Sequence, residues 1–214
     1  MSEVTSEQLH DGIVRLKLDL AAGTEGKLHA YLALLAKWNR TYNLTAVRDE
    51  AAMIGQHLLD SLAVLPHLQV DATDIHSLVD VGSGGGLPGI PLAIAKPLME
   101  VALIETSQKK ASFLQQAKIE LRLENVSVHC ARVEDMAKTR LFEVVISRAF
   151  SSLAEFVRLS VHLLAPGGRL LAMKGVYPHQ EIAQLPAGWG VVRSIPLAVP
   201  GLEAERHLIV IERS

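Results

Sequence analysis

The chain has 214 residues and a mass of 23.2 kDa, a length that predicts one domain with room for a small extension. Hydrophobic residues make up 49% and charged residues 21%, a globular composition that excludes a wholly disordered chain. The formal net charge of −2 argues against a protein that binds nucleic acid through its whole surface. The single cysteine, Cys130, excludes an intrachain disulfide and favours a cytoplasmic protein; we expect its side chain to be buried.

Membrane insertion and export are not expected from this sequence. The longest segment without a charged residue, 81–95, is interrupted by glycine and proline and is too short for a membrane helix. Residues 1–20 carry charged side chains throughout, which predicts that they hold no signal peptide. No histidine and cysteine cluster has the spacing of a zinc site, so we expect no metal.

Residues 1–70 are predicted to form an N-terminal helical extension. We expect a first helix over 6–20 and a second helix that Thr24 caps. The apolar residues of the second helix recur along one face, at Leu28, Tyr31, Leu32, Leu35 and Trp38. Asp49 is the expected cap of a third helix, whose apolar side carries Ile54, Leu58, Leu62 and Leu65.

Four side chains of this extension are given a structural role rather than a chemical one. Trp38 continues an apolar helix face and is expected in the core. Asn39 and Asn43 are expected to fix the connector between the second and third helices against the cofactor crevice. His57 lies on an apolar face, where a buried and hydrogen-bonded histidine is expected rather than a catalytic one.

Residues 71–214 alternate short apolar runs with amphipathic stretches, which predicts an α/β domain with a mostly parallel sheet. The expected parallel strands are 78–81, 101–104, 126–129, 144–146 and 170–173. The expected helices cover 90–95, a segment that Ser107 opens, and a segment through Phe156, Leu159, Leu163 and Leu164. No helical pattern separates 191–195 from 208–211, so we expect an antiparallel pair at one side of the sheet.

A glycine-rich segment, 80–89, leaves the first of these strands and enters a helix. Glycines permit positive φ and let a ligand approach the backbone, and this turn is where a doubly wound sheet binds a nucleotide-like cofactor. The dinucleotide fingerprint is matched by Gly84, Gly86 and Gly89. A pattern typical of S-adenosylmethionine enzymes is matched by Gly82, Gly84 and Gly86.

Two acidic residues favour the second pattern. Asp80 stands at the strand end, where its carboxylate can orient the loop or meet the ammonium group of the cofactor. Glu105 ends the next strand and is placed to accept hydrogen bonds from ribose hydroxyls, although NAD enzymes share this device. Within the turn itself we expect cofactor contacts from Gly82, Ser83 and Gly84. A glycine turn without a ligand is the weaker alternative.

Motifs in order along nearly the whole chain resemble the bacterial small-subunit rRNA methyltransferase G family, formerly the glucose-inhibited division protein B family. They are Lys37-Trp38-Asn39, Tyr42-Asn43-Leu44-Thr45, His57-Leu58-Leu59-Asp60-Ser61-Leu62, Asp80-Val81-Gly82-Ser83-Gly84, Leu87-Pro88-Gly89, Ser147-Arg148-Ala149-Phe150, Met173-Lys174-Gly175 and Arg206-His207-Leu208. One position departs from the family pattern, because Gln56 stands where the family usually has arginine.

This resemblance implies the class I S-adenosylmethionine-dependent methyltransferase fold, a Rossmann-like seven-strand sheet that is mostly parallel with an antiparallel strand. It implies methyl transfer from S-adenosylmethionine to N7 of guanine 527, in the 530 loop of 16S rRNA. The partner is then naked rRNA, an assembly intermediate or the 30S subunit. The cofactor contacts that carry over are Gly82, Leu87, Val133, Glu134 and Arg148.

The chemistry of N7 limits what the site residues must do. The nitrogen has an exposed lone pair, so we expect no general base. Alignment of N7, the methyl carbon and the sulfonium can supply on the order of 7–11 kcal/mol. Arg148 is the expected positioning residue, and Lys174, Arg206 and His207 are expected on a rim that meets rRNA. We expect the chain to act as a monomer.

Three other functions stay open at this point. A methyltransferase for a small molecule or a protein fits the near-neutral charge. An NAD-dependent oxidoreductase fits the glycine pattern. An assembly factor without activity would retain the fold, although the intact glycine loop speaks against it. Binding of S-adenosylmethionine, of NAD and of 30S subunits separates these functions.

Overall fold

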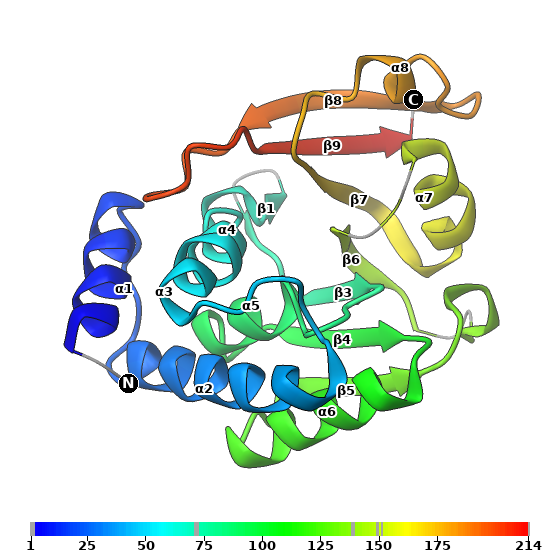
Figure 1. Cartoon of the computed structure of the whole chain (residues 1–214). Coiled ribbons are helices and arrows are strands. Elements are labelled where there is room, and N and C mark those ends of the chain that lie inside the picture. Colours follow the sequence, from blue (N-terminus) through cyan, green and yellow to red (C-terminus); the bar gives the residue numbers. More distant parts are fainter. Residues whose placement is uncertain (1–2, 71–72, 138–139, 149, 151, 214) are drawn as a thin grey trace.

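The computed structural model describes residues 3–70, 73–137, 140–148, 150 and 152–213, which form a mixed α/β fold (Figure 1). The helical elements, short π and 3-10 turns included, are α1 (Glu3–Arg15), α2 (Thr24–Tyr42), α3 (Glu50–Met53), η1 (Ile54–Leu59), α4 (Asp60–Leu62), η2 (Leu65–His67), α5 (Gly89–Ala95), α6 (Gln108–Glu120), η3 (Val133–Asp135), α7 (Leu153–Ser160), η4 (Val161–Leu163) and α8 (His179–Ile182). The strands are β1 (Gln69–Val70), β2 (Thr73–Asp74), β3 (Ser77–Val81), β4 (Glu100–Glu105), β5 (Val126–Cys130), β6 (Phe142–Ser147), β7 (Leu164–Lys174), β8 (Trp189–Pro196) and β9 (His207–Arg213).

One seven-stranded sheet organises the molecule, in the order β5-β4-β3-β6-β7-β9-β8. Strands β3 to β7 are parallel, and β9 pairs antiparallel with both β7 and β8. The predicted sheet with an antiparallel pair at one side is therefore confirmed. From β3 the chain order runs outward through β4 and β5 on one side and through β6 and β7 on the other. Open α/β sheets bind ligands at the carboxyl ends of the strands beside such a switch.

Alternate side chains of the central strands enter two hydrophobic clusters, one on each face of the sheet, because successive strand residues point in opposite directions. Leu78 of β3 belongs to a cluster that also contains residues of α1, α2, α5 and α6. Its neighbour Val79 packs with Phe156 and Val157 of α7. Figure 1 shows α2 running alongside α5 and α6 at the bottom of the view. The helical extension therefore shares its core with one face of the sheet.

The first two helices differ in detail from the sequence-based expectation. The helix expected over 6–20 ends at Arg15, because Lys17 adopts a left-handed conformation with φ 55° and Leu18 N donates back to Ile13 O at 3.2 Å. Thr24 is not the cap of α2. It is the first helical residue and is buried, while Gly23 precedes it with φ 84° and no capping side chain.

The third helix begins as predicted, with Asp49 Oδ2 accepting from Ala52 N at 2.7 Å. It then passes through a π-helical turn, η1, before α4 begins at Asp60. The apolar spacing did not predict this wider turn, because a π turn leaves the same residues on the buried side. Wider turns of this kind are often found at functional sites.

The segment after α7 also corrects the prediction. The helix expected through Leu163 and Leu164 ends at Ser160 and is followed by a short 3-10 turn. Leu164 already belongs to β7, whose pairing with β6 is irregular between Phe142 and Val144. β7 therefore starts well before the expected strand 170–173 and includes the proline and glycine residues of 166–168, next to its irregular pairing with β6.

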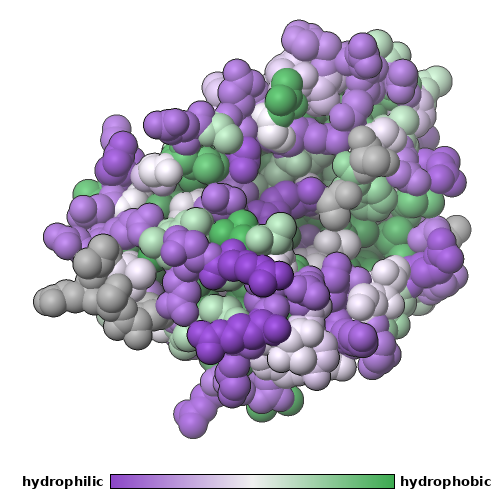
Figure 2. All heavy atoms as spheres, in the orientation of Figure 1, coloured by the Kyte–Doolittle hydropathy of each residue, from purple (hydrophilic) through white to green (hydrophobic). Residues whose placement is uncertain are grey.

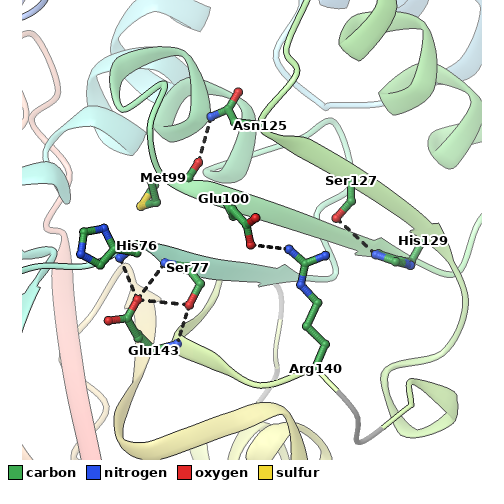
Figure 3. Close-up of polar contacts among 9 residues, drawn as sticks. All are labelled: His76, Ser77, Met99, Glu100, Asn125, Ser127, His129, Arg140 and Glu143. Carbon is green, nitrogen blue, oxygen red and sulfur yellow. Dashed lines mark hydrogen bonds and ion pairs between the residues drawn. The ribbon is translucent and has the colours of Figure 1, made fainter.

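Polar contacts tie the amino ends of the parallel strands together (Figure 3). Glu143 of β6 accepts from the backbone nitrogens of His76 and Ser77, at 2.7 and 2.9 Å, and so holds the start of β3. Arg140 donates to Glu100, the first residue of β4, at 2.6 Å. These contacts brace the edge of the sheet that lies opposite the carboxyl ends of the parallel strands.

Candidate cofactor and RNA site

Backbone hydrogen bonds shape the glycine loop that follows β3. Gly82, Gly84 and Gly86 have φ of 73°, 58° and 87°, a conformation that glycine adopts without strain. The backbone nitrogens of Gly82 and Ser83 both donate to Ile104 O of β4, at 2.9 and 3.1 Å. The loop thus curls over the carboxyl end of β4.

Two glycines of this loop have different surroundings. A side chain at Gly89 would clash with Leu103 and with the Asp80 carboxylate, so Gly89 serves close packing of α5 on the sheet. A Cβ at Gly84 would meet only Gly82 O, at 3.9 Å. Space for a ligand therefore remains beside Gly84.

The Asp80 carboxylate is fully buried under the loop. Its Oδ2 accepts from Gly89 N at 2.9 Å, while Oδ1 has no hydrogen-bond partner within the described residues. Burial raises the pKa of Asp80 to about 7, although the Gly89 N–H and the Arg148 guanidinium oppose this shift. Asp80 therefore orients the start of α5, one of the two roles expected for it.

Glu105 links two loops. Its Oε2 accepts from Gly84 N at 2.8 Å, and its Oε1 accepts from Ser107 N at 2.8 Å. The residue is only 6% exposed. Both oxygens thus hold backbone groups, and the expected contact to ribose hydroxyls would use the lone pairs that remain.

Tyr31 supports the loop from the helical extension, a role that sequence reasoning missed. Its hydroxyl donates to Gly85 O at 2.5 Å, and its ring is fully buried beside Phe113. Burial raises the pKa of Tyr31 above its usual value. The helical spacing assigned Tyr31 only to an apolar face, and nothing in that spacing indicates a distant carbonyl partner.

A cavity of about 460 Å³ opens at the carboxyl ends of β3 and β4. Its lining brings together three of the expected cofactor residues, Gly82, Val133 and Glu134, and also contains Val81, Ile104, Thr106, Ala131, Arg132, Phe150 and Leu159. Figure 2 shows hydrophobic side chains in this area, on the right of the view between α7 and the segment after β5. The volume lies within the range of about 300–1,000 Å³ that is typical of small-molecule sites.

The other five expected cofactor residues do not line this cavity: Ser83, Gly84, Leu87, Glu105 and Arg148. Ser83 is buried, and its hydroxyl donates to Asp80 O at 2.9 Å. Leu87 is buried in the core cluster of the helical face. Arg148 lies in a second pocket, described next, although Phe150 on the same segment after β6 lines the first cavity.

The second pocket has a volume of about 350 Å³ and lies at the carboxyl ends of β6 and β7. Its lining joins Arg148, Lys174 and Arg206 to Gln56, His57, Asp60, Met173 and Gly175. Arg148 Nη1 donates to Asp60 Oδ2 at 3.1 Å and to Gln56 O at 3.2 Å. Arg206 Nε donates to Asp60 Oδ1 at 3.1 Å. The structure therefore brings together three of the four residues expected to position or meet the RNA.

Lys174 and His207 make contacts that hold this rim in place. Lys174 Nζ donates to Phe150 O at 3.2 Å and pairs with Glu181 at 2.8 Å, so its charge is matched within the protein. His207 Nδ1 lies 3.0 Å from Gly175 O. Its ring meets the Tyr177 ring edge to face, with 5.6 Å between the centroids.

Three of the side chains given a structural role make such contacts, although Trp38 is only partly buried. Trp38 lies against Phe113, with 5.7 Å between the ring centroids. Asn39 Oδ1 accepts from Thr45 N at 2.9 Å and so fixes the connector. His57 is buried, and its Nε2 lies 2.8 Å from Thr45 Oγ1. Burial lowers the pKa of His57 to about 4, so this histidine is uncharged near neutral pH.

The prediction of a buried Cys130 is wrong. Its side chain is exposed, because it ends β5, the edge strand of the sheet, and its Sγ donates to Gln108 Oε1 at 3.2 Å. Within the described ranges, no group of three histidine, cysteine or acidic side chains is placed to hold a metal ion. None of the helices described here is long and apolar enough to cross a membrane.

Comparisons with known proteins agree with this geometry. The model of the GidB family, described as rRNA small subunit methyltransferase G, matches residues 24–209. The ribosomal RNA small subunit methyltransferase G of Aromatoleum aromaticum is 58% identical over 218 residues, with both chains covered completely. The protein of the same name from Azoarcus sp. is 57% identical, over 96% of this chain and 95% of its own.

Solved structures show the same fold at much lower identity. The O-methyltransferase TomG from Streptomyces achromogenes, solved in complex with S-adenosylmethionine, superposes with a TM-score of 0.62, 17% identity and complete coverage of both chains. The sheet order, with the antiparallel strand β9, is thus that of class I methyltransferases. The sequence relatives and the family model show that the chain belongs to the rRNA small subunit methyltransferase G family.

Proposed function

We propose that this protein transfers a methyl group from S-adenosylmethionine to N7 of guanine 527 in the 530 loop of 16S rRNA. The observation that carries the proposal is the pair of pockets at the carboxyl edge of the sheet. One borders the glycine loop and the other carries arginines, in a chain that belongs to an rRNA methyltransferase family. A cofactor site beside a cationic site is what a reaction between S-adenosylmethionine and RNA requires.

The residues around the first cavity fit S-adenosylmethionine. Gly82 lines the cavity and the space beside Gly84 is open, so the loop leaves room for the methionine part of the cofactor. Val133 and Glu134 of η3 line the same cavity, where an apolar and an acidic side chain suit an adenine ring and its amino group. Glu105 has lone pairs for ribose hydroxyls, and Ser83 and Leu87 support the loop from beneath.

The protein's role in the reaction is to align guanine N7 with the methyl carbon and the sulfonium sulfur. When bound, the cofactor supplies an electrophilic methyl group to the N7 lone pair and keeps the sulfur–carbon electron pair, so no proton moves. His57, the histidine of the second pocket, is buried and bonded to Thr45, which agrees with a site that needs no general base. Correct orientation of the reacting atoms accounts for on the order of 7–11 kcal/mol of barrier reduction in such reactions.

The second pocket and its rim bind the RNA. Arg148 lies one strand away from the glycine loop and positions the target nucleotide against the cofactor. Arg206 and His207 extend the rim at the start of β9, and Lys174 braces it. Residues 1–70 act as the extension that completes this pocket, and residues 71–214 carry the cofactor. The partner is the 30S subunit or its assembly intermediate in the cytoplasm, and the protein acts as a monomer.

The proposal is tested by methyl transfer with purified components. Labelled S-adenosylmethionine is incubated with the protein and 30S subunits that lack this methyl group, and tRNA and total cell protein serve as control acceptors. We expect label in 16S rRNA alone, and a rise in melting temperature with S-adenosylmethionine but not with NAD. Label in protein or in small molecules would favour the alternative methyltransferase, and stabilisation by NAD alone would end the methyltransferase assignment.

A further inference from the structure

A buried carboxylate lies at the centre of the second pocket. Asp60 is 1% exposed, and each of its two oxygens accepts from a different arginine, Arg148 and Arg206, at 3.1 Å. The two arginines are far apart in the sequence, one after β6 and the other before β9. Asp60 comes from the helical extension, immediately after the π-helical turn. Three separate segments therefore meet at one carboxylate.

The charges of this cluster do not cancel. Two guanidinium groups face one carboxylate, which leaves one positive charge. The neighbouring His57 adds none near neutral pH, because burial lowers its pKa to about 4. Lys174 is matched by Glu181. One phosphodiester group carries the single negative charge that would neutralise this positive charge.

Both arginines keep hydrogen-bond donors for a ligand. A guanidinium has five N–H donors. Arg148 uses Nη1 for Asp60 and Gln56 O, and Arg206 uses Nε for Asp60 and Nη1 for Glu205 O. Among the described residues, neither Nη2 makes a hydrogen bond. The two side chains are 30% and 25% exposed, so water or a ligand reaches them from the pocket.

We propose that Asp60 is a positioning residue that holds Arg148 and Arg206 as a clamp for one backbone phosphate of the RNA, next to the target guanine. This inference rests on the proposed rRNA methylation and adds the residue that builds its substrate site. Guanidinium forks match phosphate geometry, which makes arginine pairs suitable for this role. A carboxylate that restrains both forks reduces the side-chain entropy lost when the phosphate binds.

The variant Asp60→Asn separates orientation from charge, because the two effects have opposite signs. Loss of the carboxylate makes the pocket more positive, which by itself would tighten the binding of phosphate. It also releases one or both arginines, which weakens a site that depends on their orientation. The proposal therefore predicts weaker RNA binding in spite of the added positive charge.

The experiment uses the whole protein and two measurements. In the first, methyl transfer to 30S subunits is followed at several salt concentrations for the wild type, Asp60→Asn and Asp60→Glu. We expect Asp60→Asn to raise KM about tenfold with little change in kcat, and to reduce the salt dependence of kcat/KM by about one phosphate contact. Asp60→Glu keeps the charge and is expected to restore part of the affinity. Binding of S-adenosylmethionine should be unchanged.

Glu212→Gln is the matched control. Glu212 pairs with Arg169 at the opposite edge of the sheet, so its loss removes an arginine–carboxylate pair without touching the pocket. We expect its KM and salt dependence to equal those of the wild type. An equal loss in both variants would make the effect one of general stability and would overturn the proposal.

The second measurement needs no turnover. Anisotropy of a fluorescent single-stranded RNA, titrated without cofactor, reports on the clamp even if the wild type fails to methylate 16S rRNA. We expect Asp60→Asn to bind this RNA more weakly than the wild type and Arg206→Lys to show an intermediate loss. Unchanged or tighter binding by a folded Asp60→Asn protein would refute the clamp, whereas absent transfer by the wild type would refute the proposed function.

Discussion

Replacement of Asp80 by asparagine tests whether burial beneath the glycine loop raises the pKa of Asp80, through the pH dependence of the free energy of unfolding. The Asp80 carboxylate is fully buried, and its pKa is about 7 in the folded chain against an ordinary value of 3.8. A group with a raised pKa binds more protons in the folded state than in the unfolded state. Its contribution to stability is therefore full below about pH 4 and is lost as the pH rises to about 7.

The size of this effect follows from the two pKa values. Each pKa unit is worth about 1.4 kcal/mol, so the difference between 3.8 and about 7 corresponds to roughly 4 kcal/mol at most. His57 acts in the opposite sense. Its pKa is lowered from 6.5 to about 4, so its contribution rises with pH over that interval. Comparison of Asp80→Asn with the wild type cancels this second contribution, because both proteins keep His57.

Urea denaturation followed by tryptophan fluorescence measures the required free energies of unfolding, at pH values from about 4 to about 8. We expect the stability of the wild type, relative to Asp80→Asn, to fall by several kcal/mol, roughly 4 at most, across this range. Asp74→Asn provides a control, because Asp74 is an exposed carboxylate paired with Lys96. A difference that is flat, or that rises with pH, would refute a protonated Asp80 beneath the loop.

Three further predictions concern the loop and the pocket. Gly84→Val should weaken S-adenosylmethionine binding at least about tenfold by calorimetry, because the side chain enters the open space beside the loop, at φ 58°; unchanged affinity would mean that the cofactor binds elsewhere. Arg148→Ala should reduce methyl transfer far more than it lowers the melting temperature, and a fully active variant would leave Arg148 with a structural role only. Tyr31→Phe should cost about 1–3 kcal/mol in urea denaturation, because it leaves Gly85 O without its buried donor; a neutral change would show that water replaces the hydroxyl.

Much of the fold follows from local patterns in the sequence. The alternation of apolar runs with amphipathic stretches predicted the parallel strands, and the lack of a helix before the last run predicted the antiparallel β8–β9 pair. The cap at Asp49 was predicted correctly because its contact is local, with a partner three residues along the chain. The cap predicted at Thr24 was wrong, since a left-handed Gly23 precedes α2 and no side chain caps the helix. The burial predicted for Cys130 was wrong, because the order of strands in the whole sheet makes β5 an edge strand.

Like the fold, the candidate site has parts that local sequence patterns predict and parts that they do not. The glycine loop and Glu105 belong to local motifs, and the structure brings them together through the Gly84 N–H. Tyr31 and Asp60 act through partners more than fifty residues away, at Gly85, Arg148 and Arg206. Periodicity assigned Tyr31 to a helix face, and Asp60 was noted only as part of a motif. Contacts of this range require the three-dimensional arrangement of the helical extension on the sheet.

The position and chemistry of the methyl group in the product directly test the proposed methylation of guanine 527 at N7. 16S rRNA from 30S subunits that lack the modification is recovered after reaction with the protein and S-adenosylmethionine. It is then reduced with borohydride and treated with aniline, which cleaves RNA at 7-methylguanosine. We predict one new cleavage, at guanine 527, that requires both the protein and the cofactor. Methylation at another nucleotide, or none while S-adenosylmethionine still binds, would contradict the assignment of guanine 527 N7 as the acceptor.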